Sequence, residues 1–117
     1  MFEVVFYKNK NGNEPVFEYI KELLARKDKN SRINANKIND YIQILSEHGT
    51  RAGEPYVKHL DDDIWELRPL RNRILFAAHK GSVFVLLHYF MKQSAKTPKR
   101  EIEKAKQNFA DFIARSG

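Results

Sequence analysis

The chain has 117 residues, 42% of them apolar and 12% aromatic, which is enough to build the core of one domain over residues 1–117 without metal or disulfide support. The absence of cysteine excludes disulfide frameworks, thiolate catalysis and cysteine-ligated zinc, and it favours a reducing, cytoplasmic location. No apolar run approaches the roughly 20 residues that span a bilayer. The N-terminus turns from apolar to polar, the reverse of a signal peptide, so we expect neither membrane association nor a targeting segment.

The positive charge is confined to the second half of the chain. Residues 1–63 carry 10 Lys and Arg against 11 Asp and Glu, net −1, whereas residues 64–117 carry 11 against 4, net +7, which gives the overall +6. A one-sided positive field attracts polyanions. Nucleic acid is therefore the leading class of partner, although a charge that serves only solubility explains the composition equally well.

The first two expected elements are a strand and a helix. Residues 2–7, FEVVFY, are β-branched and aromatic and are followed by an Asn-Gly turn signal. Asn13 is the expected N-cap of a helix that has Pro15 in its first turn and ends near Arg26. The apolar residues of this helix recur at helical spacing and form one stripe: Val16, Ile20, Leu23 and Leu24.

A second helix and a loop complete the first half. Asn30 or Ser31 can cap the helix, and Gly49 supplies the left-handed residue that ends it. Residues 50–63 contain glycine, proline and three aspartates with little periodicity. We therefore expect a loop there, with a short extended piece at residues 56–60.

Three strands and a helix make up the second half. The strands are expected at residues 64–68, 73–79 and 83–91. Lys80-Gly81 predicts a two-residue turn between the last two strands. Thr97 then caps a final helix that has Pro98 at its first position.

The resulting order of elements is βααβββα. Strands joined by short connections pair antiparallel. The predicted fold class is therefore α+β, a twisted antiparallel sheet with helices packed on one face. The last strand is apolar on both sides, which predicts an interior place in the sheet.

Alternation along the strands brings basic residues to a common side of the sheet. In IWELR, the arginine Arg68 points away from the face of Trp65, and His88 and Lys92 share one side of the last strand. Together with the arginine that opens the strand between them, these residues can converge on a single surface. The candidate catalytic residues are Arg68, Arg73, His88 and Lys92.

Such a set suits RNA cleavage without a metal, which needs a base for the 2′-hydroxyl, a cation for the phosphate and an acid for the departing 5′-oxygen. Arginine supplies the cation in bidentate geometry. Neighbouring cations disfavour the ammonium form of Lys92, so it can act as a base or proton shuttle. Histidine is the side chain whose chemistry suits an acid or base at physiological pH, which makes His88 a candidate; the alternative for it is a strand-end histidine bonded to a backbone carbonyl.

Other chemistries fit the sequence less well. The consecutive residues Asp61, Asp62 and Asp63 cannot all aim at one Mg²⁺ from a strand, so a solvated turn is expected there. The histidines lack metal-ligand spacing and there is no glycine-rich phosphate loop, so we expect neither a metal nor a cofactor. Basic residues at the start of the last helix, including Lys96 and Lys99, oppose the helix dipole, and a bound phosphate would reconcile the two.

The stretch KHLDDDIWELRPLRNRILFAAHKGSVFVLLHYFMKQSAKTPKREIEKA, residues 58–105, resembles toxins of the RelE/ParE superfamily of the HigB type, in its phage-derived branch. The motifs that carry the resemblance are WELR, LLHYF followed by a lysine, KTP and the EI pair of the last helix. The resemblance implies a RelE-like fold and a ribosome-associated, metal-independent mRNA endonuclease that inhibits translation. It also implies a co-encoded antitoxin, often a helix-turn-helix protein, through which the complex binds operator DNA.

The resemblance assigns site residues as well. Its catalytic positions fall on Arg68, Arg73, His88 and Lys92. Lys58 and Lys96 match flanking basic positions, and the basic residues Arg71 and Lys99 complete the expected RNA-binding set. Gln93 stands where the family pattern has a second lysine.

Two further classes of function remain open from the sequence. One is a ParE-like, non-enzymatic inhibitor of DNA gyrase on the same fold, which needs no acid and base on the sheet. The other is a basic nucleic-acid-binding module whose arginines only neutralise phosphate. Basic residues alone fit all three classes.

Overall fold

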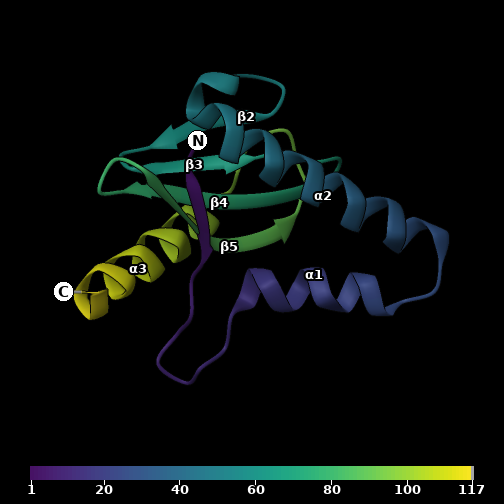
Figure 1. Ribbon diagram of the computed structural model, residues 1–117, viewed down its shortest axis with the longest axis horizontal. Coiled ribbons are helices and arrows are strands. Elements are labelled where there is room, and N and C mark those ends of the chain that lie inside the picture. The colour runs from purple at the N-terminus through teal and green to yellow at the C-terminus, as the bar shows by residue number, and fades with distance from the viewer. Residues whose placement is uncertain (117) are drawn as a thin grey trace.

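The computed structural model describes residues 1–116, which form three α-helices, a short 3₁₀ helix and a five-stranded sheet (Figure 1). The elements in chain order are β1 (Glu3–Phe6), α1 (Pro15–Ala25), α2 (Lys29–His48), the 3₁₀ helix η1 (Gly49–Ala52), β2 (Val57–Asp61), β3 (Ile64–Leu67), β4 (Asn72–His79), β5 (Val83–Met91) and α3 (Lys99–Ser116). None of the helices in this part of the chain has both the length and the apolarity to cross a membrane.

The strand order in the sheet is β1-β5-β4-β3-β2. The four strands of the second half pair antiparallel with their sequence neighbours, whereas β1 joins the sheet parallel to β5. The prediction that residues 83–91 form an interior strand is confirmed, because β5 lies between β1 and β4.

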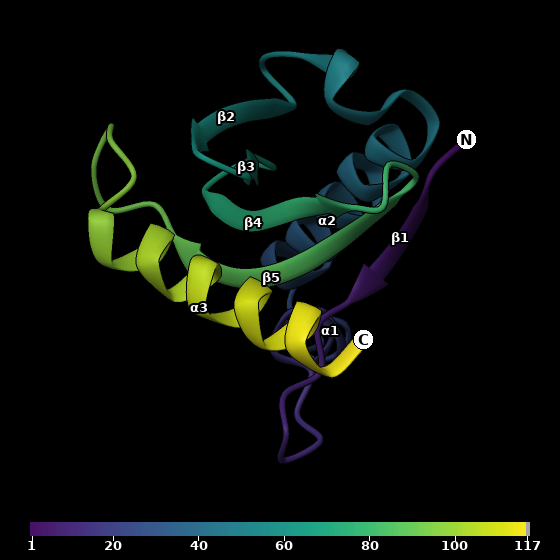
Figure 2. The same cartoon turned by 90° about the vertical axis from the view of Figure 1, so that its left-hand side faces the viewer.

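The helices cover the sheet from both sides. α1 and α2 pack together over one face, where Leu23, Ile38 and Leu45 meet Ile74 and Phe76 in one core cluster. On the other face, α3 packs its own apolar side onto a second cluster (Figure 2). The predicted α+β class, a twisted antiparallel sheet with helices packed on one face, is confirmed, with α1 and α2 as the helices on that face. Helix α3 covers the opposite face of the sheet, which we call the α3 face.

The loop predicted at residues 50–63 contains more structure than expected. Its first part is η1, and its extended piece is the full strand β2, which pairs with β3 at the edge of the sheet. The strand signal is weak because most of β2 faces solvent, so its sequence has little apolar alternation. The order of elements is therefore βααββββα when η1 is left aside.

Two predicted helix caps are wrong. Glu14, not Asn13, precedes α1, and its side chain makes no capping bond, although Pro15 occupies the first turn as predicted. α2 is capped by Asp28, whose carboxylate accepts the backbone N–H of Ser31 at 2.8 Å. An aspartate satisfies the free N–H groups of a helix start as well as asparagine or serine does, so the cap moves upstream by two or three residues.

One irregularity in β5 decides which residues face α3. Leu75 pairs with His88 and Phe76 pairs with Leu86, so Leu87 is an extra residue in β5. Such a β-bulge interrupts strict alternation. His88 therefore shares the α3 face with Leu87, not the opposite face with Leu86.

Candidate functional site

A row of side chains crosses the α3 face from the edge of the sheet to its interior. Residues that pair directly across strands share a face, and the register lines up Lys58 on β2, Glu66 on β3, Leu75 on β4 and His88 on β5. Leu75 lies in the core cluster under α3, which fixes the side of the sheet. We call these four residues the first row.

The remaining predicted catalytic residues lie on the same face, beyond the first row. Arg73 pairs with Phe90, and Phe90 packs against the core cluster under α3. One step further along, the backbone N–H of Lys92 bonds the carbonyl oxygen of Arg71 at 2.8 Å. Arg68 follows β3 beside Arg73. We refer to Arg68, Arg71, Arg73 and Lys92 together as the cationic face.

A buried glutamate joins two of these arginines. The Glu66 side chain is 1% exposed, and its Oε1 lies 3.5 Å from Nε of Arg68 and 3.9 Å from Nε of Arg73. Its other oxygen, Oε2, accepts the hydroxyl hydrogen of Thr97 at 2.6 Å. One carboxylate therefore balances two guanidinium groups and bonds the chain segment ahead of α3. We call Glu66, Arg68, Arg73 and Thr97 the Glu66 cluster.

Arg73 is the more buried of the two arginines, at 6% exposure. Its Nη1 donates to the carbonyl oxygens of Leu70 and Asn72, both at 2.8 Å. Burial lowers the pKa of the Arg73 guanidinium and Glu66 opposes the change, but a guanidinium keeps its proton in any protein environment. Arg73 thus holds the β3–β4 loop, and its role toward substrate stays a prediction.

Arg68 reaches closer to solvent. Its side chain is 21% exposed, and its Nη1 also lies 3.4 Å from Glu54 Oε1 at the surface. The Nε atom is buried and has no hydrogen-bond partner within residues 1–116. Of the two arginines in the Glu66 cluster, Arg68 is the one with guanidinium surface available to a ligand.

His88 is paired with a residue of α3. Its Nε2 lies 2.7 Å from Glu101 Oε1, and both side chains are 18% exposed. The partner of His88 is therefore a carboxylate and not the backbone carbonyl considered as the alternative. Two residues of the first row thus bond this end of the chain: Glu66 bonds Thr97 just ahead of α3, and His88 bonds Glu101 in its first turn.

The outermost basic residues surround the loop between β5 and α3. Nη2 of Arg71 donates to the carbonyl oxygen of Lys92 at 2.8 Å, and these two residues line a small open hollow of about 310 Å³ together with residues 93–95. Lys96 lies in the same loop, which projects beside the first turn of α3 (Figure 2). Lys99, the first residue of α3, and Lys58 in the first row are both exposed.

The structure therefore brings Arg68 and Arg73 together at one carboxylate, and Arg71 and Lys92 together at the next step of the sheet. It sets His88 apart, two strands from Glu66, in its own pair with Glu101. Three residues of this arrangement were missing from the predicted set: Glu66, Thr97 and Glu101. Only Glu66 had a signal in the sequence, because alternation in IWELR placed it on the same side of the strand as Arg68.

The acidic run that begins at the last residue of β2 contacts α3 and not the cationic face. Asp61 and Asp62 lie 2.7 and 3.0 Å from Nζ of Lys106 on α3. These hydrogen bonds raise the pKa of the lysine and hold the pKa of the Asp61 carboxyl below its usual range. The run is thus a surface ion pair between the sheet edge and α3.

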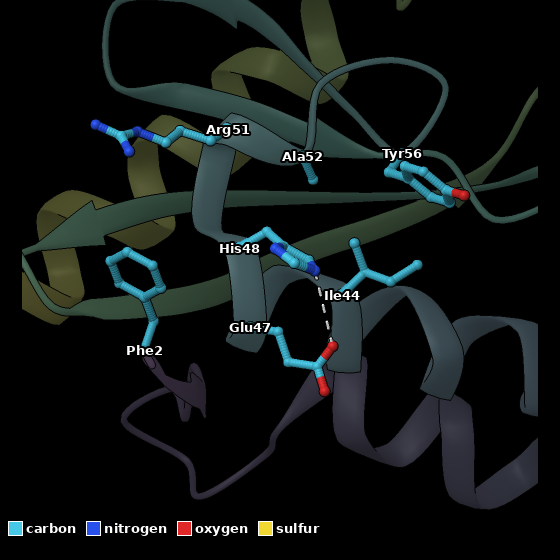
Figure 3. Close-up of a pocket in the computed structure, with 7 residues that line it drawn as sticks. All are labelled: Phe2, Ile44, Glu47, His48, Arg51, Ala52 and Tyr56. Atoms are coloured by element: carbon cyan, nitrogen blue, oxygen red, sulfur yellow. Dashed lines mark ion pairs between the residues drawn. The ribbon is translucent and has the colours of Figure 1, made fainter.

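A broad groove lies away from the cationic face, where α2, η1 and the residue ahead of β1 meet. It has a volume of about 760 Å³ and is lined mainly by apolar and aromatic side chains, with Phe2 and Tyr56 on opposite sides of it (Figure 3). The charges at its rim are mixed: Glu47, His48 and Arg51. It contains none of the predicted site residues.

Comparison with known protein families identifies the class. The family model described as phage-derived protein Gp49-like (DUF891) matches residues 21–110, which include all eight predicted site residues. The chain belongs to this family, which falls broadly among toxins of the RelE/HigB type. No curated protein matches the chain significantly.

Proposed function

We propose that the protein is the toxin of a type II toxin–antitoxin system, and that it inhibits translation as a metal-independent, ribosome-dependent mRNA endonuclease of the HigB type. The observation that carries the proposal is that the cationic face lies on the same side of the sheet as His88, in a family consistent with toxins of such systems. Metal-independent RNA cleavage needs these groups on one surface.

Each catalytic residue has a distinct role in this proposal. Arg68 neutralises the charge that develops on the scissile phosphate, since its guanidinium reaches the surface. Arg73 keeps the β3–β4 loop and Glu66 in place beneath it. His88 accepts the proton of the 2′-hydroxyl, and Lys92 donates a proton to the departing 5′-oxygen.

The exposed basic residues hold the substrate. Lys58, Arg71, Lys96 and Lys99 all lie on or beside the α3 face with exposed side chains. Each such residue that contacts a phosphate releases counterions, so mRNA binding should weaken as the salt concentration rises. The same residues supply positive charge for a ribosomal RNA surface.

The proposed regulator is a cognate helix-turn-helix antitoxin that binds operator DNA and carries the toxin to it. Charge complementarity with the cationic face calls for an acidic surface on this partner. The toxin–antitoxin complex should therefore form more slowly as salt concentration increases. Association that is indifferent to salt would contradict an acidic partner surface.

Induced expression with primer extension on cellular mRNA tests the proposal. The wild-type chain should arrest growth and produce discrete cleavage ends, and Arg68→Ala should abolish both. Arg51→Ala is the matched control, because Arg51 is exposed on η1 at the groove. Harmless accumulation of folded wild-type protein, or cleavage by Arg68→Ala at the wild-type rate, would overturn the proposal.

The ParE-like alternative makes a different prediction for the same strain. An inhibitor of DNA gyrase would stop supercoiling while mRNA stays intact. A basic nucleic-acid-binding module would bind RNA in a salt-dependent manner and produce no new ends. Supercoiling assays with purified gyrase, run beside the primer extension, separate these outcomes.

A further inference from the structure

The pairing of His88 with Glu101 assigns each ring nitrogen a separate task. Nε2 lies 2.7 Å from a carboxylate oxygen, and a carboxylate accepts hydrogen bonds but donates none when ionised. The hydrogen of this contact therefore belongs to Nε2. In a neutral imidazole the other nitrogen, Nδ1, then carries the lone pair.

Glu101 is well fixed for this task. It lies in the first turn of α3, where its backbone N–H donates to the carbonyl oxygen of Pro98 at 3.1 Å. Thr97, four residues earlier, bonds Glu66, which lies two strands from His88 in the first row. The carboxylate thus projects onto His88 from a helix end that is itself bonded to the sheet.

We infer that Glu101 is a positioning residue: it holds His88 in the Nε2–H tautomer, so that Nδ1 is the atom that accepts the substrate proton. This inference rests on the proposed function. In the transfer, the 2′-hydroxyl proton passes to Nδ1 as the O2′–P bond forms, and the P–O5′ bond breaks as the 5′-oxygen takes a proton from the Lys92 ammonium. The Glu101 carboxylate stabilises the imidazolium that results.

The role of Glu101 goes beyond support of the helix. A structural strut would need only contact between α3 and β5, so its removal would lower stability without a specific loss of cleavage rate. A positioning residue requires one tautomer, and a carboxylate imposes the Nε2–H form because it can only accept. The cleavage rate of folded variants, measured beside the tautomer, therefore distinguishes the two roles.

Imidazole ¹⁵N shifts of the full-length protein measure this tautomer directly. The wild type should show a protonated Nε2 and a bare Nδ1 at His88. Glu101→Gln should lose this preference, because a side-chain amide donates as well as accepts and so satisfies either tautomer. Glu101→Ala should give a tautomer mixture. Glu103→Ala, an exposed neighbour on α3, should leave His88 unchanged.

Single-turnover cleavage of ribosome-bound mRNA completes the test. Glu101→Ala should lose on the order of 10-fold or more in rate, part of the 10²- to 10⁴-fold that general acid–base catalysis contributes, with mRNA affinity preserved. Glu101→Gln should lose rate as well, since its amide fixes neither the tautomer nor the charge of the imidazolium. A protonated Nδ1 in the wild type, or wild-type rates in Glu101→Ala, would overturn the role of Glu101 alone, whereas absence of cleavage by the wild type would overturn the proposed function.

Discussion

Thr97 donates its hydroxyl hydrogen to Oε2 of Glu66 over 2.6 Å, and this bond joins the segment ahead of α3 to a carboxylate buried in the sheet. Glu101, one helical turn later, pairs with His88 at 2.7 Å. Leu75 lies between Glu66 and His88 in the register. The contacts of Thr97 and Glu101 therefore reach across three strands of the sheet, from β3 to β5. The geometry of the cationic face therefore depends on how this helix end is anchored.

Thr97→Val tests the anchor. Valine keeps the shape of threonine but removes the donor, which leaves a buried carboxylate oxygen without its partner. Such a loss costs about 1 to 3 kcal/mol, so the free energy of unfolding in urea should fall by that amount. Ser94→Ala in the exposed loop serves as the control and should be nearly neutral. Equal stability of the two variants would show that the Thr97 bond contributes nothing.

Glu66→Gln tests the charge balance of the Glu66 cluster. The substitution keeps the size of the side chain but leaves the buried Arg73 without its counter-charge, and breaking a buried pair in this way costs about 3 to 5 kcal/mol. Glu54→Gln is the matched control, since Glu54 also contacts Arg68 but at the surface, where a pair contributes about 0 to 1 kcal/mol. Urea denaturation of both variants should show this contrast, and similar losses would refute it.

Much of the fold could be predicted because helices, strands and their ends depend largely on residues close together in the chain. The run of β5 and the terminal Gly49 of α2 are fixed by neighbours in the chain, and the structure has both as predicted. In the predicted stripe of α1, Val16 and Leu23 are buried but Leu24 is 60% exposed. Strand β2 was only an extended piece in the prediction, because an exposed edge strand has little apolar pattern. It becomes a full strand because it pairs with β3 in an antiparallel hairpin.

For the candidate site, the sequence indicated which basic residues to consider but not how they are arranged. Alternation placed Arg68 and Glu66 on one side correctly, because the pleat of β3 is regular. The bulge at Leu87 and the contacts of Thr97 and Glu101 depend on how α3 crosses the sheet, and no spacing in the sequence encodes that crossing. Sequence reasoning therefore named the basic residues, whose role toward substrate stays a prediction, and missed the acidic residues that contact them.

Leu70 is a site of backbone strain that a substitution can relieve. Its φ is 58°, in the left-handed region that leucine rarely adopts, and its side chain is 45% exposed. Left-handed backbone costs a non-glycine residue about 1 to 2 kcal/mol, so Leu70→Gly should preserve or raise the free energy of unfolding. Leu24→Gly, at an exposed position inside α1, should lower it by about 1 kcal/mol. Destabilisation by both variants would contradict the assigned strain.

Tyr7→Phe should change the acid sensitivity of the protein. The Tyr7 hydroxyl donates to Asp111 at 2.5 Å, and with Arg115 it holds the pKa of the Asp111 carboxyl below its usual range. A folded-state pKa below the unfolded value gives stability that is present above the unfolded pKa and is lost as pH falls through the folded pKa.

In Tyr7→Phe the Asp111 pKa should therefore rise toward its ordinary value, and less stability should be lost on acidification. A carboxyl ¹³C titration measures the pKa, and urea denaturation across the acid range measures the stability. The pKa of Asp28, which depends on the distant Ser31, should stay unchanged. An unshifted Asp111 pKa would show that Arg115 alone sets it.

Lys92→Arg separates proton transfer from charge on the cationic face. The substitution keeps the positive charge beside Arg71, so the mRNA affinity and its salt dependence should stay close to those of the wild type. A guanidinium cannot release its proton, so the rate of single-turnover cleavage should fall by the 10²- to 10⁴-fold, approximately, that an acid–base group contributes. Lys104→Arg, an exposed position on α3, is the control and should cleave normally. Lys92→Arg that cleaves at the wild-type rate would make Lys92 a phosphate contact only, and the donor for the 5′-oxygen would have to be another group on the α3 face.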